Sequence, residues 1–386
     1  MAGGAVQQLG MPPGGGGDLN VDYYVPDFRI EVEGKQLSPS THGDVIDLKV
    51  NLAADELGGF DVTLNNWDDE HLRFKYSDSA ELMIGNMVRI ELGYVNRTRQ
   101  VIHGPITSVS PRFSENGALT VSISGKDSLE FLKARKPKSG ETVKWVKKTD
   151  TEIAQDIARR NHLDFVGEKS PITHDVVYQK NLDDAQFLLQ RARRIDFECF
   201  VLVGSKAGRN TLYFQPPRDG RDGKTARTYE LEWGRSLRSF SPTLSSDRQV
   251  SKVTVRGWDP REKKAIVGVA TDKDLPPSTK KDSTSGPELA SKKFADRENL
   301  VVDRPVASER EARDLAVSIL RERATRFGTG NGSTIGIPEL QPDDNIDLKG
   351  VGDRFSGSYR VRKVTHSIGD GGYTTTFDVE TMYSGS

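Results

Sequence analysis

The 386-residue sequence contains a single cysteine, Cys199, and no apolar run as long as the roughly 18 residues needed to cross a bilayer. One cysteine cannot close an intramolecular disulfide, and it supplies only one of the four ligands of a structural zinc site. The start of the sequence also lacks a basic segment followed by an apolar core. We therefore predict a fold stabilised by packing, with neither a Sec-type signal nor a transmembrane anchor.

An excess of positive charge is also missing. The 55 Lys and Arg residues face 56 Asp and Glu residues, which gives a formal net charge of −1. Such a chain has no general attraction for nucleic acid or for an acidic membrane surface, so we predict no specific nucleic-acid binding. The length predicts two or three domains, and a hydrophobic content of 35% is enough for several modest cores.

The first part of the chain has the alternating pattern of β-strands. From Asp27 to Lys126, apolar residues recur at every second position in short runs separated by turn residues, as in Phe28, Ile30 and Val32. We predict a first tube-like antiparallel β-barrel at residues 22–135. Residues 1–21 are rich in Gly and Pro, and we predict a flexible arm there because such a composition loses much backbone entropy on ordering.

A different pattern follows a polar linker at residues 134–140. Thr149 or Asp150 is predicted to cap a helix, and Asp183 with Gln186 is typical of the capping box of a second helix. The alternating segment that follows predicts a hairpin of residues 197–203 and 211–214. We therefore predict a small inserted α+β domain at residues 136–220.

The last part returns to β-alternation, and we predict a second tube-like β-barrel at residues 221–386. Within it, the polar segment 271–296 predicts a mobile loop, and an apolar stripe after Ser308 and Glu311 predicts a helix at 308–327. The predicted fold class is thus mainly β, with two tube-like antiparallel β-barrels and an α+β insert.

The two predicted barrels end with a similar order of features. Seven residues separate Val109 from the turn at Asn116, and seven separate Val364 from the turn at Gly371. Either the similarity is one that any two antiparallel meanders would have, or the chain contains a duplicated barrel. In the second case a trimer would present six similar barrels, and a threefold ring would match a sixfold one.

No segment has the pattern of a catalytic, cofactor-binding or metal site. The Asp68–His71 run lacks the spacing of a calcium loop, and Cys199 lies in an apolar run where its thiol is expected to be inert. Gly328–Ser333 resembles a phosphate-binding loop but follows a predicted helix instead of preceding one, so we predict a helix stop and a loop. Arg191–Arg194 suits the C-terminal end of a helix, although it also has the charge of a contact patch for an acidic partner.

The order of these features resembles the tail-hub family of contractile phages, the late control D proteins, which are similar to the hub part of VgrG-like spike proteins. The resemblance extends from about residue 22 to the end of the sequence, and no single motif carries it. Its residues are Val25–Ile30, Gly104–Ser110, Phe355–Val361, Val364–His366 and Gly371–Thr375.

This resemblance implies a structural baseplate hub and not an enzyme. It implies a homotrimer, a pseudo-sixfold ring that joins a trimeric spike protein to a hexameric inner tube protein, starts tube assembly and contacts other baseplate proteins. It also implies assembly in the bacterial cytoplasm as part of a phage virion or a contractile injection particle. No β-helix pattern precedes Ser386, so the spike is expected to be a separate polypeptide.

Two alternatives remain open from the sequence. One is a cell-wall-degrading baseplate enzyme whose active site would lie in the α+β insert. The other is a carbohydrate- or receptor-binding β-protein, which would need clustered exposed aromatic residues, whereas the four tryptophans are scattered: Trp67, Trp145, Trp233 and Trp258.

Overall fold

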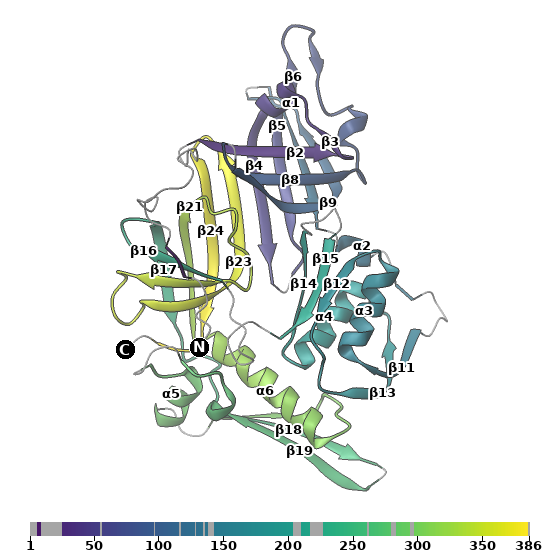
Figure 1. Cartoon of the computed structure of the whole chain (residues 1–386), viewed down its shortest axis with the longest axis vertical. Helices are drawn as coiled ribbons and strands as arrows, with labels where there is room; N and C mark the ends of the chain where they lie inside the picture. Colours follow the sequence, from purple (N-terminus) through teal and green to yellow (C-terminus); the bar gives the residue numbers. More distant parts are fainter. Residues whose placement is uncertain are drawn as a thin grey trace.

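The structure is a computed structural model, and its fold is mainly β, as predicted (Figure 1). The predicted arm at 1–21, apart from residues 6–8, and the predicted boundaries near 135 and 220 fall outside the described residues, so they stay predictions. The residues that the structure describes are 6–8, 25–54, 56–95, 97–115, 117–127, 129–133, 136–137, 143–203, 210–216, 227–260, 262–278, 283–293 and 297–384.

The first β unit, as we call it, contains six main strands whose apolar faces enclose one core. Ile30, Leu48, Phe60, Ile90 and Val121 are all buried in that core, which is the outcome that the alternating pattern predicts. The strands are β2 (Pro26–Val32), β4 (Val45–Ala53), β5 (Gly59–Asn65), β8 (Met87–Tyr94), β9 (Arg97–Arg112) and β10 (Thr120–Lys126). The shorter elements are β3 (Lys35–Gln36), α1 (Pro39–Gly43), β6 (Trp67–Asp68), β7 (Arg73–Phe74) and η1 (Ala80–Leu82).

The second β unit also has six main strands and a core of its own. Tyr229, Leu231, Ile346 and Phe377 are buried there. The strands are β16 (Thr228–Glu232), β17 (Leu237–Leu244), β21 (Gly328–Ile335), β22 (Asn345–Lys349), β23 (Gly357–Gly369) and β24 (Gly372–Thr381), and β1 (Val6–Gln8) lies beside β16.

The two β units have the same strand order. With the six strands of each unit numbered along the chain, both sheets run 1-4-5-6-3-2: β2-β8-β9-β10-β5-β4 in the first and β16-β22-β23-β24-β21-β17 in the second. Strand 1 is antiparallel to strand 4 in the first unit and parallel to it in the second. A shared order over six strands favours a duplicated unit over a chance similarity of meanders.

The two units are joined edge to edge. Strand β23 pairs with β4 from Lys363 opposite Ala53 to Ile368 opposite Leu48, so the main strands form one continuous sheet. The Tyr94 hydroxyl adds a cross-unit hydrogen bond of 2.8 Å to the Gly336 carbonyl oxygen. Figure 1 shows the two sheets side by side, with β23 and β4 at the boundary.

Two further cores surround helices. The α+β insert packs two amphipathic helices against its strands, and the predicted caps are confirmed because Thr149 and Asp183 accept hydrogen bonds from the Glu152 and Gln186 amides. Its elements are α2 (Glu130–Lys133), β11 (Val143–Thr149), α3 (Asp150–Arg160), β12 (Asp164–Gly167), β13 (Thr173–Gln179), α4 (Asp184–Arg194), β14 (Glu198–Val203) and β15 (Asn210–Gln215).

The predicted helix at 308–327 is confirmed as α6, and it covers a three-stranded sheet that belongs to neither β unit. Segment 221–386 therefore contributes two cores, one more than the single barrel predicted there. The elements of this helix-covered sheet are β18 (Lys252–Asp259), β19 (Lys264–Thr271), η2 (Asp272–Asp274), α5 (Gly286–Lys293), β20 (Glu298–Val301) and α6 (Glu309–Thr325).

The structure differs from the predicted loops in two places. Segment 271–296 contains α5, which is stabilised by a hydrogen bond from the Glu288 amide to the Ser285 hydroxyl and by burial of Ala290. Gly328–Ser333 lies in β21, between β17 and β24. Its glycines favour a loop locally, but their bare backbone accommodates the rings of Phe240 and Phe377, which a Cβ would meet at under 3.0 Å.

Candidate assembly surfaces

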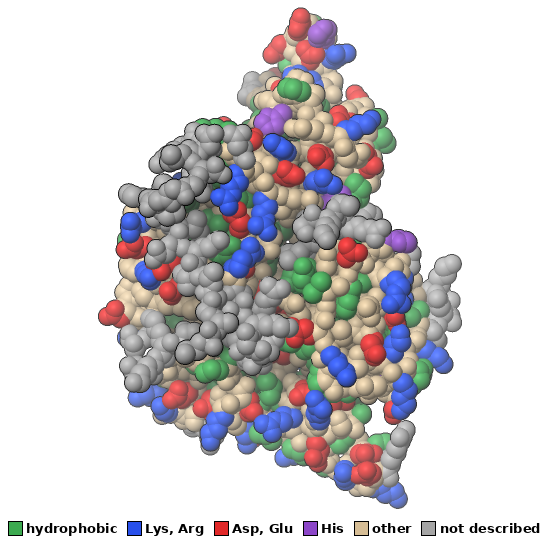
Figure 2. All heavy atoms as spheres, viewed as in Figure 1, with side chains coloured by type: hydrophobic (Ala, Val, Ile, Leu, Met, Phe, Trp, Pro, Cys, Tyr) green, Lys and Arg blue, Asp and Glu red, His purple; other side chains and the backbone are tan. Residues whose placement is uncertain are grey.

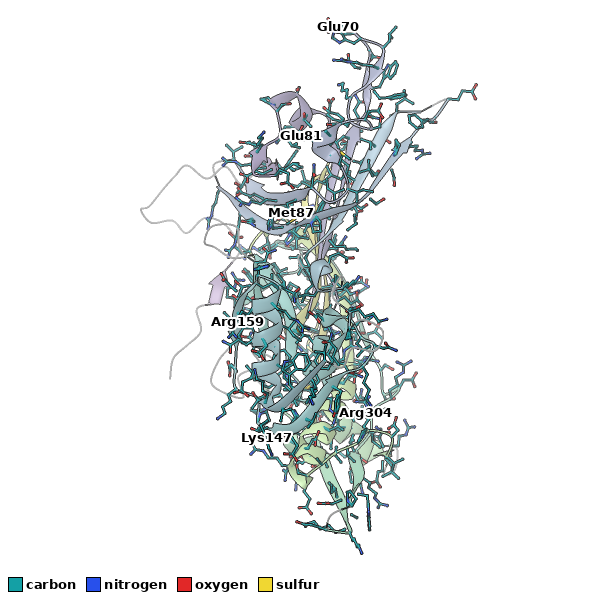
Figure 3. All side chains as sticks on the ribbon, turned by 90° about the vertical axis from the view of Figure 1, so that its right-hand side faces the viewer. Glu70, Glu81, Met87, Lys147, Arg159 and Arg304 are labelled. Carbon is teal, nitrogen blue, oxygen red and sulfur yellow. The ribbon has the colours of Figure 1, made fainter. Side chains whose placement is uncertain are left out.

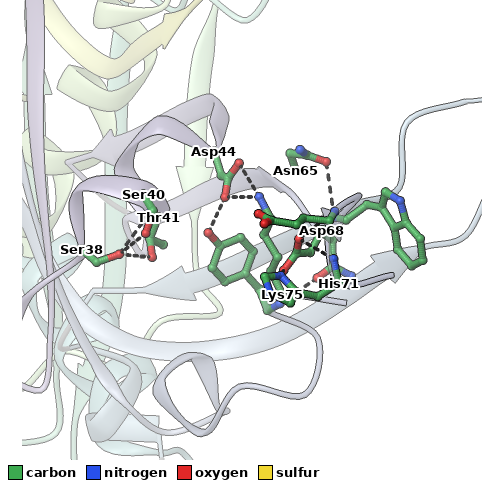
Figure 4. Close-up of polar contacts among 12 residues, drawn as sticks. Ser38, Ser40, Thr41, Asp44, Asn65, Asp68, His71 and Lys75 are labelled. Carbon is green, nitrogen blue, oxygen red and sulfur yellow. Dashed lines mark hydrogen bonds and ion pairs between the residues drawn. The ribbon is translucent and has the colours of Figure 1, made fainter. Parts of the chain in front are cut away.

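The Asp68–His71 run closes the turn of the β6–β7 hairpin. One Asp68 carboxylate oxygen accepts from the Glu70 and His71 amides at 3.2 Å, and the other lies 3.0 Å from His71 Nδ1 (Figure 4). Figure 3 places Glu70 at one extreme of the molecule. Among the residues with assigned positions, no cluster of three or more His, Cys, Asp or Glu side chains is arranged to hold a metal ion.

The base of this hairpin is fixed by a partly buried polar contact and by aromatic rings. Asp44 accepts from Lys75 Nζ at 2.9 Å and from the Tyr76 hydroxyl at 2.5 Å (Figure 4). Burial and the neighbouring Asp44 raise the pKa of Tyr76 to about 12. Beside it, the Phe74 and Phe113 ring centroids lie 5.0 Å apart, and Phe113 remains 62% exposed. Phe113, which directly follows β9, thus presents an exposed aromatic ring beside the hairpin.

The arginines of the 191–194 cluster make contacts inside the protein. Arg191 Nε lies 2.5 Å from an Asp150 carboxylate oxygen, and Arg194 pairs with Glu311 of α6 at 2.9 Å. Burial would raise the pKa of Asp150, but the hydrogen bond from His174 and the charge of Arg191 outweigh it and hold that pKa below its usual range. The Arg191 contact lies within the α+β insert and the Arg194 contact links the insert to α6, so both arginines are accounted for without an acidic partner.

A second ionic cluster joins the α+β insert to the second β unit. The Arg360 guanidinium contacts carboxylates from three separate segments: Asp343 at 2.9 Å, Glu380 at 3.2 Å, and Glu198 of β14. The three carboxylates are almost fully buried, and Arg360 is largely buried. The cluster lies between segments far apart in the sequence, so nothing in the local pattern predicted it.

A basic groove that the sequence did not indicate lies between β20 and the C-terminal half of α6. Its volume is about 420 Å³, and four arginines with two carboxylates line it: Arg248, Arg304, Arg323, Arg326, Asp303 and Glu322. Figure 3 places Arg304 in the half of the molecule away from Glu70. Figure 2 shows that basic and acidic side chains are interspersed over the visible surface as a whole. The arginines of the groove come from three segments, which is why no run in the sequence revealed it.

The single thiol has the environment that the sequence predicted. Cys199 is buried in the core of the α+β insert, and burial raises its pKa to about 12. This buried position agrees with the apolar run around Cys199, and the inertness of its thiol stays a prediction. Within the described part of the chain, no helix is long and apolar enough to cross a membrane.

The continuous sheet has one face that no sequence pattern assigned. Its strands run β17-β21-β24-β23-β4-β5-β10-β9, and on one side most of their positions carry Ser, Thr, Asn or charged residues that are exposed or half-buried, with the apolar Ala53 and Ile335 among them. We call these residues the polar face: Ser239, Ser241, Thr243, Thr329, Asn331, Ser333, Thr374, Thr376, Asp378, Lys363, Thr365, Ser367, Asp47, Lys49, Asn51, Asp61, Thr63, Asn65, Thr120, Ser122, Ser124, Ser108, Ser110 and Arg112.

Comparison with known sequences assigns the chain to a family. The model of the family described as the Alg8 N-terminal domain matches residues 23–370, so the chain belongs to this family. The description names a domain and no activity. No curated protein matches the chain in sequence.

Comparison with solved structures shows a shared fold. The 43 kDa tail protein of prophage MuSo2 from Shewanella oneidensis has 14% identity and a TM-score of 0.66, covering 92% of this chain and 98% of that one. A tail protein from Neisseria meningitidis MC58 has 13% identity and a TM-score of 0.65, covering 92% and 96%.

A third similar structure is the E. coli c3393 protein, described as a type VI secretion system component with structural similarity to the T4 bacteriophage tail proteins gp27 and gp5. It has 14% identity and a TM-score of 0.58, with 91% of this chain and 76% of that one covered. The chain therefore has the fold of tail proteins.

Proposed function

We propose that the chain is the structural baseplate hub of a contractile tail or injection system. Three copies form a ring of six β units that joins a trimeric spike to a hexameric inner tube and starts tube assembly. The particle assembles in the bacterial cytoplasm, and the hub acts by surface complementarity and not by catalysis. One observation carries this proposal: among the described residues, the chain makes one joint between equivalent units and leaves the complementary edges of a second joint open.

The open edges follow from the shared strand order. In the existing joint, strand 5 of the second unit, β23, pairs with strand 2 of the first unit, β4. The equivalent strands are β9 and β17, and in the described structure residues 239–244 of β17 pair only with β21, while residues 107–112 of β9 pair only with β10. In the ring, β9 of one copy pairs with β17 of the next.

The register of this second joint can be read from the first. Val109 lies opposite Ile123 as Val364 lies opposite Phe377, so Val109 is the equivalent of Val364. Carried through the sheet, this equivalence places Val109 opposite the partner's Leu244 and Phe113 opposite the partner's Phe240. Pro111 and Pro242 occupy matched positions on the open edges, where a missing N–H protects each edge from pairing with unrelated strands.

The mass of the purified chain in solution tests the ring. Light scattering is expected to give three times the chain mass of 42.7 kDa, and the trimer is expected to bind both a purified hexameric tube protein and a trimeric spike protein. A stable dimer or tetramer, or a trimer with no affinity for either partner, would contradict the proposal.

A variant of the open edge tests the second joint. Phe113→Asp places a charge opposite the partner's Phe240, so we expect it to leave the chain monomeric where the wild type is trimeric. The circular dichroism spectrum should be unchanged, because Phe113 is largely exposed. The matched control is Leu300→Asp, which charges a similarly exposed side chain on β20 of the helix-covered sheet and should leave the trimer intact.

A further inference from the structure

We infer that the polar face lines a channel through the ring and forms a hydroxyl-rich wall of no net charge for whatever passes. This inference rests on the proposed ring, and it adds which residues face the lumen and what chemistry they present. The polar face crosses the joint between the two units without interruption, because β23 and β4 contribute adjacent rows to it.

The layers of each unit decide which side of the sheet faces inward. The opposite side of these strands is apolar and is covered by a second layer, β2 with β8 in the first unit and β16 with β22 in the second. When a sheet closes into a cylinder, the outer circumference has more room than the inner one. The covered side therefore lies outside, and the polar face lies inside.

The size of the cylinder follows from strand spacing. Each copy contributes the eight strands of the polar face, so three copies give about 24 strands, and at about 4.8 Å per strand the circumference is roughly 115 Å and the diameter roughly 37 Å. Strand tilt widens this further. An extended or helical chain about 10–12 Å across passes through such a channel.

Several side chains of the polar face are hydrogen-bonded to one another across strands. Cross-strand hydrogen bonds link Thr63 to Ser122 at 3.2 Å and Thr365 to Asn51 at 2.8 Å. The three carboxylates of the face, on Asp47, Asp61 and Asp378, are balanced by three cations, on Lys49, Lys363 and Arg112, so 3 − 3 leaves no net charge. Such a wall exerts little attraction on a cargo of either sign.

The position of the polar face is tested by labelling single cysteines. The wild-type chain is a suitable background because its one thiol, Cys199, is buried and its pKa is raised by burial. Thr376→Cys places a thiol at an exposed position in the middle of the polar face, and Ser241→Cys places one at a second exposed position of the same face. The matched control is Thr173→Cys, at an exposed position of β13 in the α+β insert.

Each assembled variant is treated with a small maleimide and with a maleimide on a polymer coil wider than the estimated channel. The small reagent is expected to label all three variants at similar rates. Because thiol reactions depend on access, the polymer reagent is expected to label Thr376→Cys and Ser241→Cys at least about tenfold more slowly than Thr173→Cys. This difference should disappear when the ring is dissociated.

The outcomes separate this inference from the proposed function. A trimer in which the polymer labels Thr376→Cys and Ser241→Cys as fast as Thr173→Cys overturns the lumen assignment and leaves the ring intact. A chain whose mass stays that of a dimer or tetramer overturns the proposed ring, and the lumen assignment with it.

Discussion

At the scale of single residues, the buried thiol gives a direct prediction. Because its pKa is about 12 and its side chain lies in the core of the α+β insert, Cys199 is expected not to react with a maleimide at pH 7 in the folded protein. In denaturant the same thiol should react completely. Mass spectrometry of the two samples measures this, and a labelled folded protein would show that the core opens locally.

A second residue, His366, predicts how stability depends on pH. Burial lowers its pKa to about 4, and its ring lies 3.0 Å from the Tyr373 hydroxyl in the second β unit. The folded state therefore keeps it neutral, while the unfolded state binds a proton below a pKa of about 6.5. The contribution of the neutral His366 to folding stability is present above pH 6.5 and is lost as the pH falls toward 4. Between pH 7.5 and pH 5 the free energy of unfolding falls by about 2 kcal/mol on account of His366.

The comparison with His366→Gln isolates this contribution, since the carboxylates titrate in both proteins. Denaturant unfolding at the two pH values should show that the wild type loses about 2 kcal/mol more than the variant. Equal losses would mean that His366 is not held neutral.

At the scale of elements, strand β21 shows how tertiary contacts override local preference. A Cβ on Gly332 would lie 2.6 Å from a ring carbon of Phe377, so Gly332→Ala is expected to destabilise the protein by about 1–3 kcal/mol. Gly371→Ala is the control, because a Cβ there meets nothing within 4 Å. Thermal unfolding of both variants is the measurement, and a tolerated Gly332→Ala would argue against the close packing of β21.

Elements differ in how well the sequence predicts them. The helices α3, α4 and α6 were predicted because cap and apolar stripe lie within one short segment, as Ser308 and Leu315 do in α6. Strand β21 and helix α5 were missed because their stability comes from distant partners, such as Phe377 for Gly332 and Met382 for Gly286.

At the scale of the whole molecule, the Arg360 cluster joins the α+β insert to the second β unit. Replacing the guanidinium in Arg360→Met leaves three buried carboxylates near one another without their shared cation, so we expect a loss of about 3–5 kcal/mol. Arg362→Met is the control, because Glu380 keeps its contact with Arg360. Denaturant unfolding measures both, and equal small losses would mean that the cluster is not held as described.

The sequence by itself determined the mainly β class, the helix caps and the burial of the one thiol, because alternation, capping and burial of an apolar run are encoded by residues close together in the chain. The spacing between strand and turn in the two predicted barrels also pointed to a duplicated barrel as one of two alternatives. Only the tertiary structure decided the shared strand order, the joint of β23 with β4 and the polar face. Each of these depends on which strands pair and in what register, and Thr365 and Asn51 meet across more than 300 positions of sequence.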